Sequence, residues 1–131
     1  MKLVSIYQCF CDQTRLRILH LLSQGPLCVC HVQVILGETQ VKISKHLAYL
    51  KGHGLVEAHR ECSWMIYQLP AKQSRELQAN LACLQDCVGE QAIFRKDSKK
   101  LKQLRAKFEK GSPLCLVKPT SRQPESTCIS Q

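Results

Sequence analysis

The sequence has no apolar run that approaches the roughly 20 residues needed to cross a bilayer. Its N-terminus also lacks the charged, apolar and small-residue order of a secretory signal peptide. From these two absences we expect a cytosolic protein without membrane spans. No internal repeat is present, and 131 residues suffice for one domain with a tail but not for a second independent core.

Acidic residues are scarce relative to basic ones. The chain has 10 Asp and Glu against 19 Lys and Arg, a formal net charge of +9 and a pI near 9.2. Such a balance favours a polyanionic partner such as nucleic acid. Charge alone does not separate DNA from RNA or from an anionic membrane surface.

Cysteine, in contrast, is abundant for a protein of a reducing compartment. The nine cysteines are Cys9, Cys11, Cys28, Cys30, Cys62, Cys83, Cys87, Cys115 and Cys128. An odd number cannot all pair within one chain, and the cytosol disfavours structural disulfides. We therefore interpret the cysteines as thiolate ligands or redox groups.

Capping signals define a helix over residues 12–25. Asp12 is a good N-cap, leucines follow at helical spacing, and Gly25-Pro26 ends the helix. Apolar residues between Leu3 and Phe10 predict a short amphipathic helix before it.

A helix-turn-helix unit is predicted next. A helix over 27–36 is followed by a short turn at 37–39 and by a second helix with apolar residues at Ile43, Leu47 and Leu50. Thr39 caps this second helix and Gly52 and Gly54 end it. Such a unit places its second helix in the major groove of DNA.

The remaining segments predict a wing and a dimerising end. Aromatic and β-branched residues on both sides of 61–63 indicate a β-hairpin closed by Pro70. An apolar stripe over Ser74–Phe94 predicts one helix of about five turns that a partner subunit buries. Residues 96–110 form a basic helical segment, and 111–131, rich in Pro, Ser and Thr, form a disordered tail.

These elements make a mostly α fold with a small antiparallel β-hairpin, a winged helix-turn-helix that dimerises through its N-terminal and C-terminal helices. We assign residues 1–94 to the DNA-binding and dimerisation domain, 95–110 to a basic helical extension and 111–131 to the tail.

Three motifs resemble those of the ArsR/SmtB family of metalloregulators. Residues 11–19 (CDQTRLRIL) look like its (S)DPTRLRIL helix, residues 27–32 (LCVCHV) its LCVCDL metal motif, and residues 44–51 (SKHLAYLK) its SKHLxxL recognition helix. Residues 54–56 and 60–64 resemble the GLV and REGxW of the wing, so the likeness runs in order over about residues 3–70. It implies a homodimeric repressor that leaves its operator when metal binds, and no enzyme.

Two departures from the family pattern bear on the ligand. In the arsenic-sensing version a third cysteine follows the Cys-Val-Cys three residues on, where this chain has Gln33. The family's zinc-type site on the last helix needs Asp and His pairs, and Ser74–Phe94 contains no histidine. Zinc sensing of that type is therefore disfavoured.

Cys28 and Cys30 are the predicted metal ligands. Trivalent arsenic and antimony are soft and take three thiolates, so we expect As(III) or Sb(III) as inducer, ahead of cadmium or lead. In a regular helix positions i and i+2 point about 200° apart, so both sulfurs can bind one ion only at the helix start or in a distorted turn. The ordinary alternative is a pair of buried core cysteines.

The third ligand stays open at this point. Its candidates are Cys9, Cys11, Cys83 and Cys87, the last two being one helical turn apart and able to form a second or alternative site. The ordinary alternative for each pair is packing at the dimer interface. Cys62, which replaces a turn glycine, and the tail cysteines Cys115 and Cys128 are not expected to be primary ligands.

For operator DNA we expect contacts from the first turns of the second helix and from the wing. The candidates are Thr39, Gln40, Lys42, Ser44, Lys45, His46 and Arg60, with His59 beside Arg60. Gln40 is the best base reader because a side-chain amide can pair with adenine through two bonds, whereas Ser44 and Lys45 suit phosphates. His46 is equally compatible with packing.

Three other classes of function are alternatives to a metal-responsive repressor. An enzyme with Cys30 as nucleophile and His31 as base is disfavoured, because neighbouring positions on a helix do not face each other. A thiol redox sensor on the same fold is a stronger alternative, using Cys83 and Cys87 or Cys9 and Cys11. A pure interaction module would keep DNA binding without Gln40 and Lys45.

Overall fold

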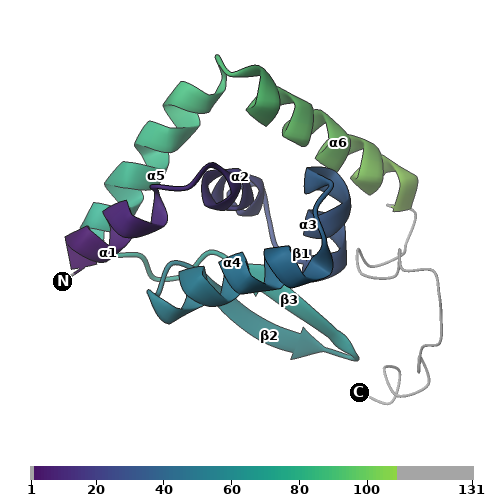
Figure 1. Cartoon of the computed structure of the whole chain (residues 1–131), viewed down its shortest axis with the longest axis horizontal. Helices are drawn as coiled ribbons and strands as arrows, with labels where there is room; N and C mark the ends of the chain where they lie inside the picture. The colour runs from purple at the N-terminus through teal and green to yellow at the C-terminus, as the bar shows by residue number, and fades with distance from the viewer. Residues whose placement is uncertain (1, 109–131) are drawn as a thin grey trace.

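The computed structural model describes residues 2–108, which form a mostly helical fold with a small antiparallel sheet (Figure 1). In chain order the elements are α1 (Lys2–Cys9), α2 (Gln13–Leu22), β1 (Leu27–Cys28), α3 (Val29–Leu36), α4 (Gln40–Gly52), β2 (Glu57–Glu61), β3 (Trp64–Gln68), α5 (Arg75–Val88) and α6 (Ala92–Phe108). The predicted winged helix-turn-helix class is confirmed. The predicted tail over 111–131, with Cys115 and Cys128, lies outside the described residues. Within 2–108, no helix combines the length and the apolar character that a membrane crossing demands.

Side-chain caps begin three of the helices where the sequence predicted them. The Asp12 carboxylate accepts a hydrogen bond from the Arg15 backbone N–H (3.1 Å) and starts α2. Thr39 Oγ1 accepts from the Lys42 N–H (3.2 Å) at α4. Ser74 caps α5 in the same way. Each cap satisfies a backbone donor that the first turn of a helix leaves without a partner.

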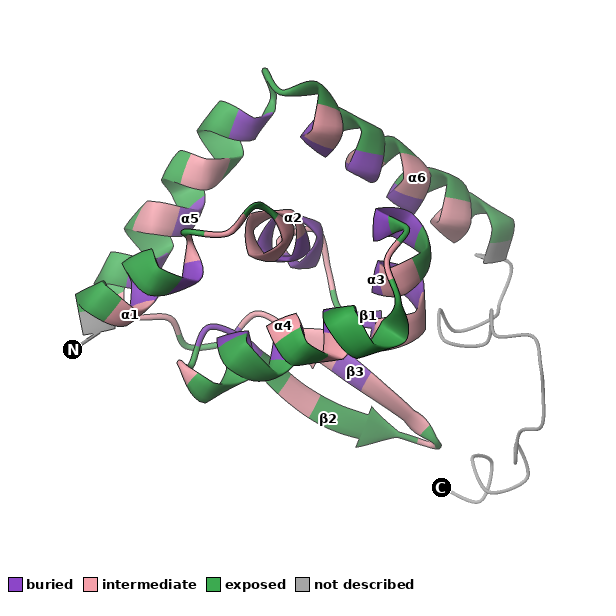
Figure 2. Cartoon of the chain, in the orientation of Figure 1, coloured by how far each residue is buried: buried purple, intermediate pink, exposed green. Residues whose placement is uncertain are grey.

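The helix-turn-helix consists of α3, a tight turn and α4. Gly37 ends α3 in the left-handed conformation (φ 69°), which glycine adopts without a Cβ penalty. Ile43, Leu47 and Leu50 form the buried face of α4 and join the main core with residues of α2 and α3. Figure 2 shows that buried residues of the helices face the centre of the molecule, while α4 exposes its outer side.

The first helix of this unit is shorter than predicted, because Leu27 and Cys28 are extended. They form β1, which pairs antiparallel with β3 in the register Leu27↔Tyr67 and Cys28↔Ile66. The predicted hairpin is therefore part of a three-stranded sheet in the order β1-β3-β2. The pairing supplies hydrogen-bond partners to an edge of β3 that a lone hairpin would leave open.

The predicted single helix over Ser74–Phe94 is wrong, since the chain breaks at residues 89–91 between α5 and α6. The change of direction brings Phe94 and Leu101 of α6 into buried positions and packs α6 on α2 and α3. Leu77 and Leu81 of α5 are already buried in the core of the single chain. The apolar stripe therefore needs no second subunit to cover these two leucines.

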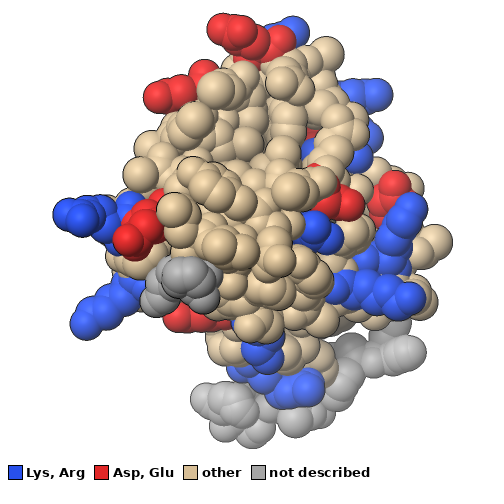
Figure 3. Space-filling model, turned by 60° about the vertical axis from the view of Figure 1, so that its left-hand side comes forward, with Lys and Arg blue, Asp and Glu red and all other residues tan. Residues whose placement is uncertain are grey.

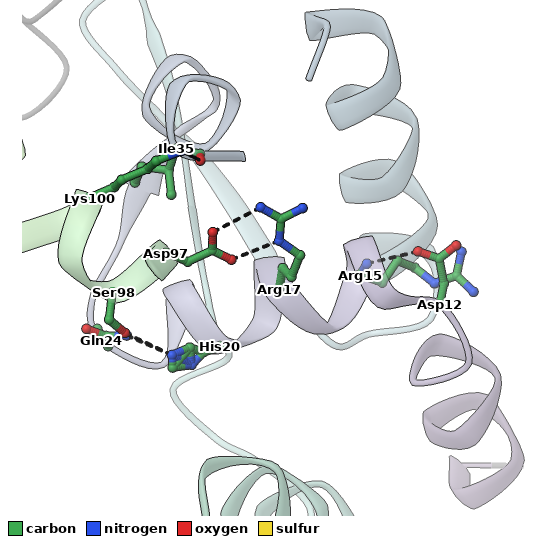
Figure 4. Close-up of polar contacts among 9 residues, drawn as sticks. All are labelled: Asp12, Arg15, Arg17, His20, Gln24, Ile35, Asp97, Ser98 and Lys100. Atoms are coloured by element: carbon green, nitrogen blue, oxygen red, sulfur yellow. Dashed lines mark hydrogen bonds and ion pairs between the residues drawn. The ribbon is translucent and has the colours of Figure 1, made fainter. Parts of the chain in front are cut away.

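Polar contacts fix α6 to the body of the fold (Figure 4). The guanidinium of Arg17 donates two hydrogen bonds to Asp97, at 2.9 and 3.0 Å, and Asp97 is only 1% exposed. This hydrogen-bonded pairing raises the pKa of Arg17. Close by, His20 Nε2 lies 3.0 Å from Ser98 Oγ, and burial lowers the pKa of His20 against the opposing effect of the Asp97 charge. At the far end of α3, Lys100 Nζ donates to the Ile35 carbonyl (3.3 Å).

Candidate thiol site and nucleic-acid interface

Cys28 and Cys30 converge at the N-terminus of α3. Cys28 is the N-cap residue, with extended backbone angles (φ −91°, ψ 162°), and is not part of the helix. The opposite directions expected for i and i+2 in a regular helix therefore do not apply, and the two Sγ atoms lie 2.6 Å apart, where one thiol can donate to the other. From the sequence, both sulfurs were expected to reach one ion only at the start of a helix or in a distorted turn. The observed arrangement is the first of these, at the helix start.

The thiol pair lies between the helix-turn-helix and the sheet. Cys28 is buried and packs with Ile66 of β3, and the half-buried Cys30 and Trp64 pack against these two residues. Cys28 also pairs with Ile66 through the backbone ladder of β1 and β3. A displacement of Cys28 would consequently disturb both the start of α3 and the strand that forms the wing.

His31 is a candidate ligand that sequence reasoning missed. Its Nδ1 lies 3.7 Å from Cys28 Sγ, and one ligand atom from each of Cys28, Cys30 and His31 falls within 4.8 Å of the others. The side chain is 1% exposed, and among residues 2–108 its Nε2 has no hydrogen-bond partner. The signal was present in the sequence, because His31 is three residues after Cys28, and the side chain of an N-cap residue lies near the third residue of its helix.

The other cysteines do not join this group within the described residues. Cys9 is fully buried in the main core, and burial raises its pKa against a smaller lowering by Arg15. Cys11 is exposed and its Sγ donates to the Tyr7 carbonyl (3.1 Å). Cys83 and Cys87 are exposed on α5. Cys62 lies in the β2–β3 turn with a positive φ of 61°, consistent with its position in place of a turn glycine.

The outer face of α4 carries the predicted DNA-contacting side chains. Gln40, Lys42 and Lys45 are exposed, whereas Ser44 and His46 are half-buried. Lys42 Nζ lies 3.2 Å from a carboxylate oxygen of Glu38, four residues earlier in the turn before α4. Arg60 and His59 are exposed on β2 of the wing. In Figure 3, Lys and Arg side chains project from the lower end of the visible face, which carries α4 and the wing in Figure 1.

Two details of this face bear on the predicted DNA contacts. The Thr39 hydroxyl accepts a hydrogen bond from the Lys42 N–H, so its lone pairs are partly engaged in capping α4. Val41, which no sequence pattern singled out, is 66% exposed between Gln40 and Lys42. An exposed apolar side chain at the start of a reading helix suits contact with a thymine methyl group.

Comparison with known proteins identifies relatives of this arrangement. Residues 12–58 match the family described as bacterial regulatory protein, arsR family. The arsenical resistance operon repressor of Escherichia coli K12 is 37% identical over 97 residues, which cover 70% of this chain and 81% of that protein.

Two solved structures share the fold. The homodimeric winged helix-turn-helix domain of a possible ArsR-family regulator from Mycobacterium bovis has a TM-score of 0.58 at 28% identity, with 68% of this chain and 80% of that one covered. The antimony-specific transcriptional repressor AntR has a TM-score of 0.54 at 25% identity, with 67% and 80% covered.

Proposed function

Because this chain belongs to the arsR family of transcriptional repressors, we propose that it releases its operator DNA when As(III) or Sb(III) binds Cys28 and Cys30. The observation that carries the proposal is the pair of thiols 2.6 Å apart at the start of α3, the helix that supports the reading helix. The names of the arsenical resistance repressor of E. coli and of the antimony-specific repressor support a metalloid inducer.

The donor set suits a thiophilic ion. Two thiolates provide the sulfur ligands that soft ions prefer, and the N-terminal end of α3 favours the negative charge that thiolates carry. The third position is open to His31, whose Nδ1 is within reach, or to a further thiol. Cadmium and lead remain the alternative ions, because they also bind thiolates.

Binding at this place would act on DNA through α3. Drawing Cys28 and Cys30 around one ion changes the first turn of α3, and α3 packs directly on α4. The same change pulls on β1, which is paired with the wing strand β3. A coupling of only about 1–3 kcal/mol between the two sites would be typical of allosteric proteins.

On DNA, we propose a homodimer that places its two α4 helices in successive major grooves, about 34 Å apart, on an imperfect palindrome. The homodimeric neighbour from M. bovis supports this assembly. The basic residues of α4 and the wing, together with the net charge of +9, would meet the phosphate backbone.

The central test is a titration of the protein bound to a fluorescent fragment from upstream of its gene. We expect arsenite or antimonite to release the wild-type protein, because ligation rearranges the N-terminus of α3. The variant Cys28→Ser/Cys30→Ser should bind the fragment but stay bound at the same ion concentrations, because it has neither of the two sulfurs.

The same assay separates the alternatives. Release by cadmium alone would reassign the ion, and release by peroxide without metal would indicate a thiol redox sensor. If the double variant is released as readily as the wild type, the inducer site is elsewhere. Cys11→Ser, which removes an exposed candidate for the third ligand, shows in the same assay whether that thiol takes part in release.

A second prediction concerns the roles of two exposed residues of α4. Lys45→Ala should weaken binding to all DNA sequences and lower the slope of log K against log salt by about 0.9 for each phosphate that the lysine neutralises. Gln40→Ala should leave that slope unchanged and cost about 1–3 kcal/mol of discrimination at one base pair of each half-site. Fluorescence anisotropy at several salt concentrations measures both effects.

Lys96→Ala, an exposed cation on α6, is the matched control for Lys45→Ala. It should leave both the slope and the preference among sequences unchanged. Equal effects of Lys96→Ala and Lys45→Ala would mean that α4 does not hold the phosphates. DNA binding that survives removal of Gln40 and Lys45 together would favour a pure interaction module.

A further inference from the structure

One side chain connects the first helix of the fold to the reading helix. The guanidinium of Arg15, in the first turn of α2, donates hydrogen bonds to the carbonyls of Gln8 (3.0 Å) and Cys9 (3.1 Å), which end α1. The Cζ atom of the same guanidinium lies 4.2 Å from the centroid of the Tyr49 ring on α4. Arg15 therefore contacts the end of α1 and the C-terminal half of α4 at the same time.

Tyr49 is also held by its own helix. Its ring stacks on the imidazole of His53, with the ring centroids 4.6 Å apart and the planes at 25° to each other. His53 is the C-cap residue of α4, and its Nδ1 lies 3.2 Å from the Tyr49 carbonyl. A cation is attracted to the face of an aromatic ring, and two rings attract each other when stacked with an offset, so both neighbours restrict the orientation of the Tyr49 ring.

The contact between Arg15 and Tyr49 joins two helices that otherwise have little contact. Within residues 2–108, α1 packs chiefly on α5, whereas α4 packs on α2 and α3. In Figure 1, α4 begins beside α3 and ends on the side of the molecule where α1 lies. The end of the reading helix is therefore fixed to α1 through the guanidinium of Arg15.

We propose that Arg15 and Tyr49 are positioning residues that set the distance and the angle between the two reading helices of the dimer. This inference rests on the proposed binding of operator DNA by a homodimer. An operator offers its two half-sites at a fixed spacing, and α1 is one of the helices through which we predict that the dimer forms. A contact that fixes α4 to α1 in each subunit fixes the two reading helices relative to each other, because symmetry repeats it in both subunits.

The two partners differ in their place in the sequence motifs. Arg15 lies in the segment that resembles (S)DPTRLRIL, whereas Tyr49 occupies one of the two positions that the SKHLxxL pattern leaves open. A residue without an aromatic face at position 49 would leave Arg15 bonded to α1 but not to α4. Position 49 is therefore the one to change in a test.

The test measures how strictly the protein requires one spacing of the half-sites. A footprint on the fluorescent fragment from upstream of the gene locates the centre of the site. One base pair inserted there moves a half-site by about 3.4 Å and turns it by about 34°. We expect the wild type to bind the original fragment at least about tenfold more tightly than the lengthened one, because both half-sites must be bound at once. Tyr49→Leu and Arg15→Met should reduce this ratio to within about threefold, since a less constrained α4 can follow the displaced half-site.

Tyr49→Phe is the matched control, because phenylalanine keeps the aromatic face, and it should retain the wild-type ratio. Urea unfolding of each variant measures its stability separately. A contact that only stabilised the fold would lower the affinity for both fragments by the same factor. The ratio of the two affinities would then stay unchanged.

A second measurement needs no DNA. A nitroxide coupled to a keto amino acid in place of Lys51, in the last turn of α4, reports the distance between the two reading helices by pulsed electron paramagnetic resonance. We expect one narrow distance distribution for the wild type and for Tyr49→Phe. Tyr49→Leu should give a broader distribution.

A Tyr49→Leu variant that keeps the wild-type ratio or the narrow distribution would overturn the proposal, as would a wild type that binds both fragments equally well. Failure of the proposed function is seen separately. A wild-type protein that does not bind the fragment, or whose spin labels show no pair, is not an operator-binding homodimer. Neither measurement depends on the response to arsenite, which the Cys28→Ser/Cys30→Ser titration tests.

Discussion

Replacing Arg17 by Met is expected to lower the free energy of unfolding by about 3–5 kcal/mol, the usual cost of removing one partner of a buried ion pair. The reason is the environment of Asp97, which is 1% exposed and receives two hydrogen bonds from Arg17, at 2.9 and 3.0 Å. Without the guanidinium the carboxylate would stay buried after losing this countercharge and both of these donated hydrogen bonds. Urea unfolding monitored by circular dichroism, at one fixed protein concentration, measures the change.

The control distinguishes a loss of charge balance from a loss of packing. Arg17→Met/Asp97→Leu removes both charges and should recover most of the stability, because a buried pair can often be replaced by apolar residues at little cost. Lys96→Met, on the exposed side of α6, should change stability by less than about 0.5 kcal/mol. An Arg17→Met variant as stable as wild type would show that α6 does not depend on this pair for its position.

The ion pair also illustrates which parts of the fold could be predicted from sequence. Asp12 and Thr39 start helices through contacts with residues three positions away, and these local signals were sufficient. Arg17 and Asp97 are 80 residues apart in the chain. No local pattern indicates that α6 turns back onto α2. The apolar spacing over Ser74–Phe94 therefore predicted one continuous helix.

Strand β1 was missed for a similar reason. Leu27 and Cys28 continue the apolar pattern of the helix that follows, and their extended conformation depends on backbone pairing with Tyr67 and Ile66 of β3. The periodicity of apolar residues along the sequence does not reveal that strand pairing. It nevertheless decides the chemistry of the site, because only a Cys28 outside the helix brings its sulfur to that of Cys30.

The candidate site was thus predictable in its thiols but not in its surroundings. The Cys-Val-Cys motif indicated Cys28 and Cys30, whose role as ligands remains a prediction. Four further cysteines were candidates for the third ligand, and within residues 2–108 none of them joins the pair. Among residues 2–108 the additional donor beside the pair is His31, a nitrogen ligand where the family pattern suggests a sulfur.

Replacing His31 should affect the affinity for cadmium and the affinity for arsenite differently, because the two ions prefer different donor atoms. Cys28→Ser should lower the affinity for both arsenite and cadmium by at least about 100-fold, because loss of even an outer-shell partner of a metal site costs 10–100-fold. His31→Asn should lower cadmium affinity by at least about tenfold on the same reasoning, since cadmium accepts imidazole nitrogen. It should leave arsenite affinity within about twofold, because trivalent arsenic prefers sulfur to nitrogen donors.

Equilibrium competition with a chelating dye for cadmium and tryptophan fluorescence for arsenite measure these affinities, with Trp64 packed against the thiol pair as the reporter. His59→Asn, an exposed histidine on the wing, is the control and should bind both ions as wild type does. Circular dichroism confirms that His31→Asn, which changes a buried residue, is folded. Because ligation requires thiolates, affinities should rise with pH for all variants that keep both cysteines.

The comparison of the two ions then decides how the third position is filled. If His31→Asn weakens arsenite as much as cadmium, the imidazole nitrogen completes the metalloid site and one subunit is sufficient for it. If arsenite is unaffected, its third ligand is a sulfur that residues 2–108 of one chain do not bring to the pair. The remaining sources would be a thiol of the partner subunit, a cysteine beyond residue 108 or a small-molecule thiol, and an arsenite titration with and without added thiol distinguishes the last from the others.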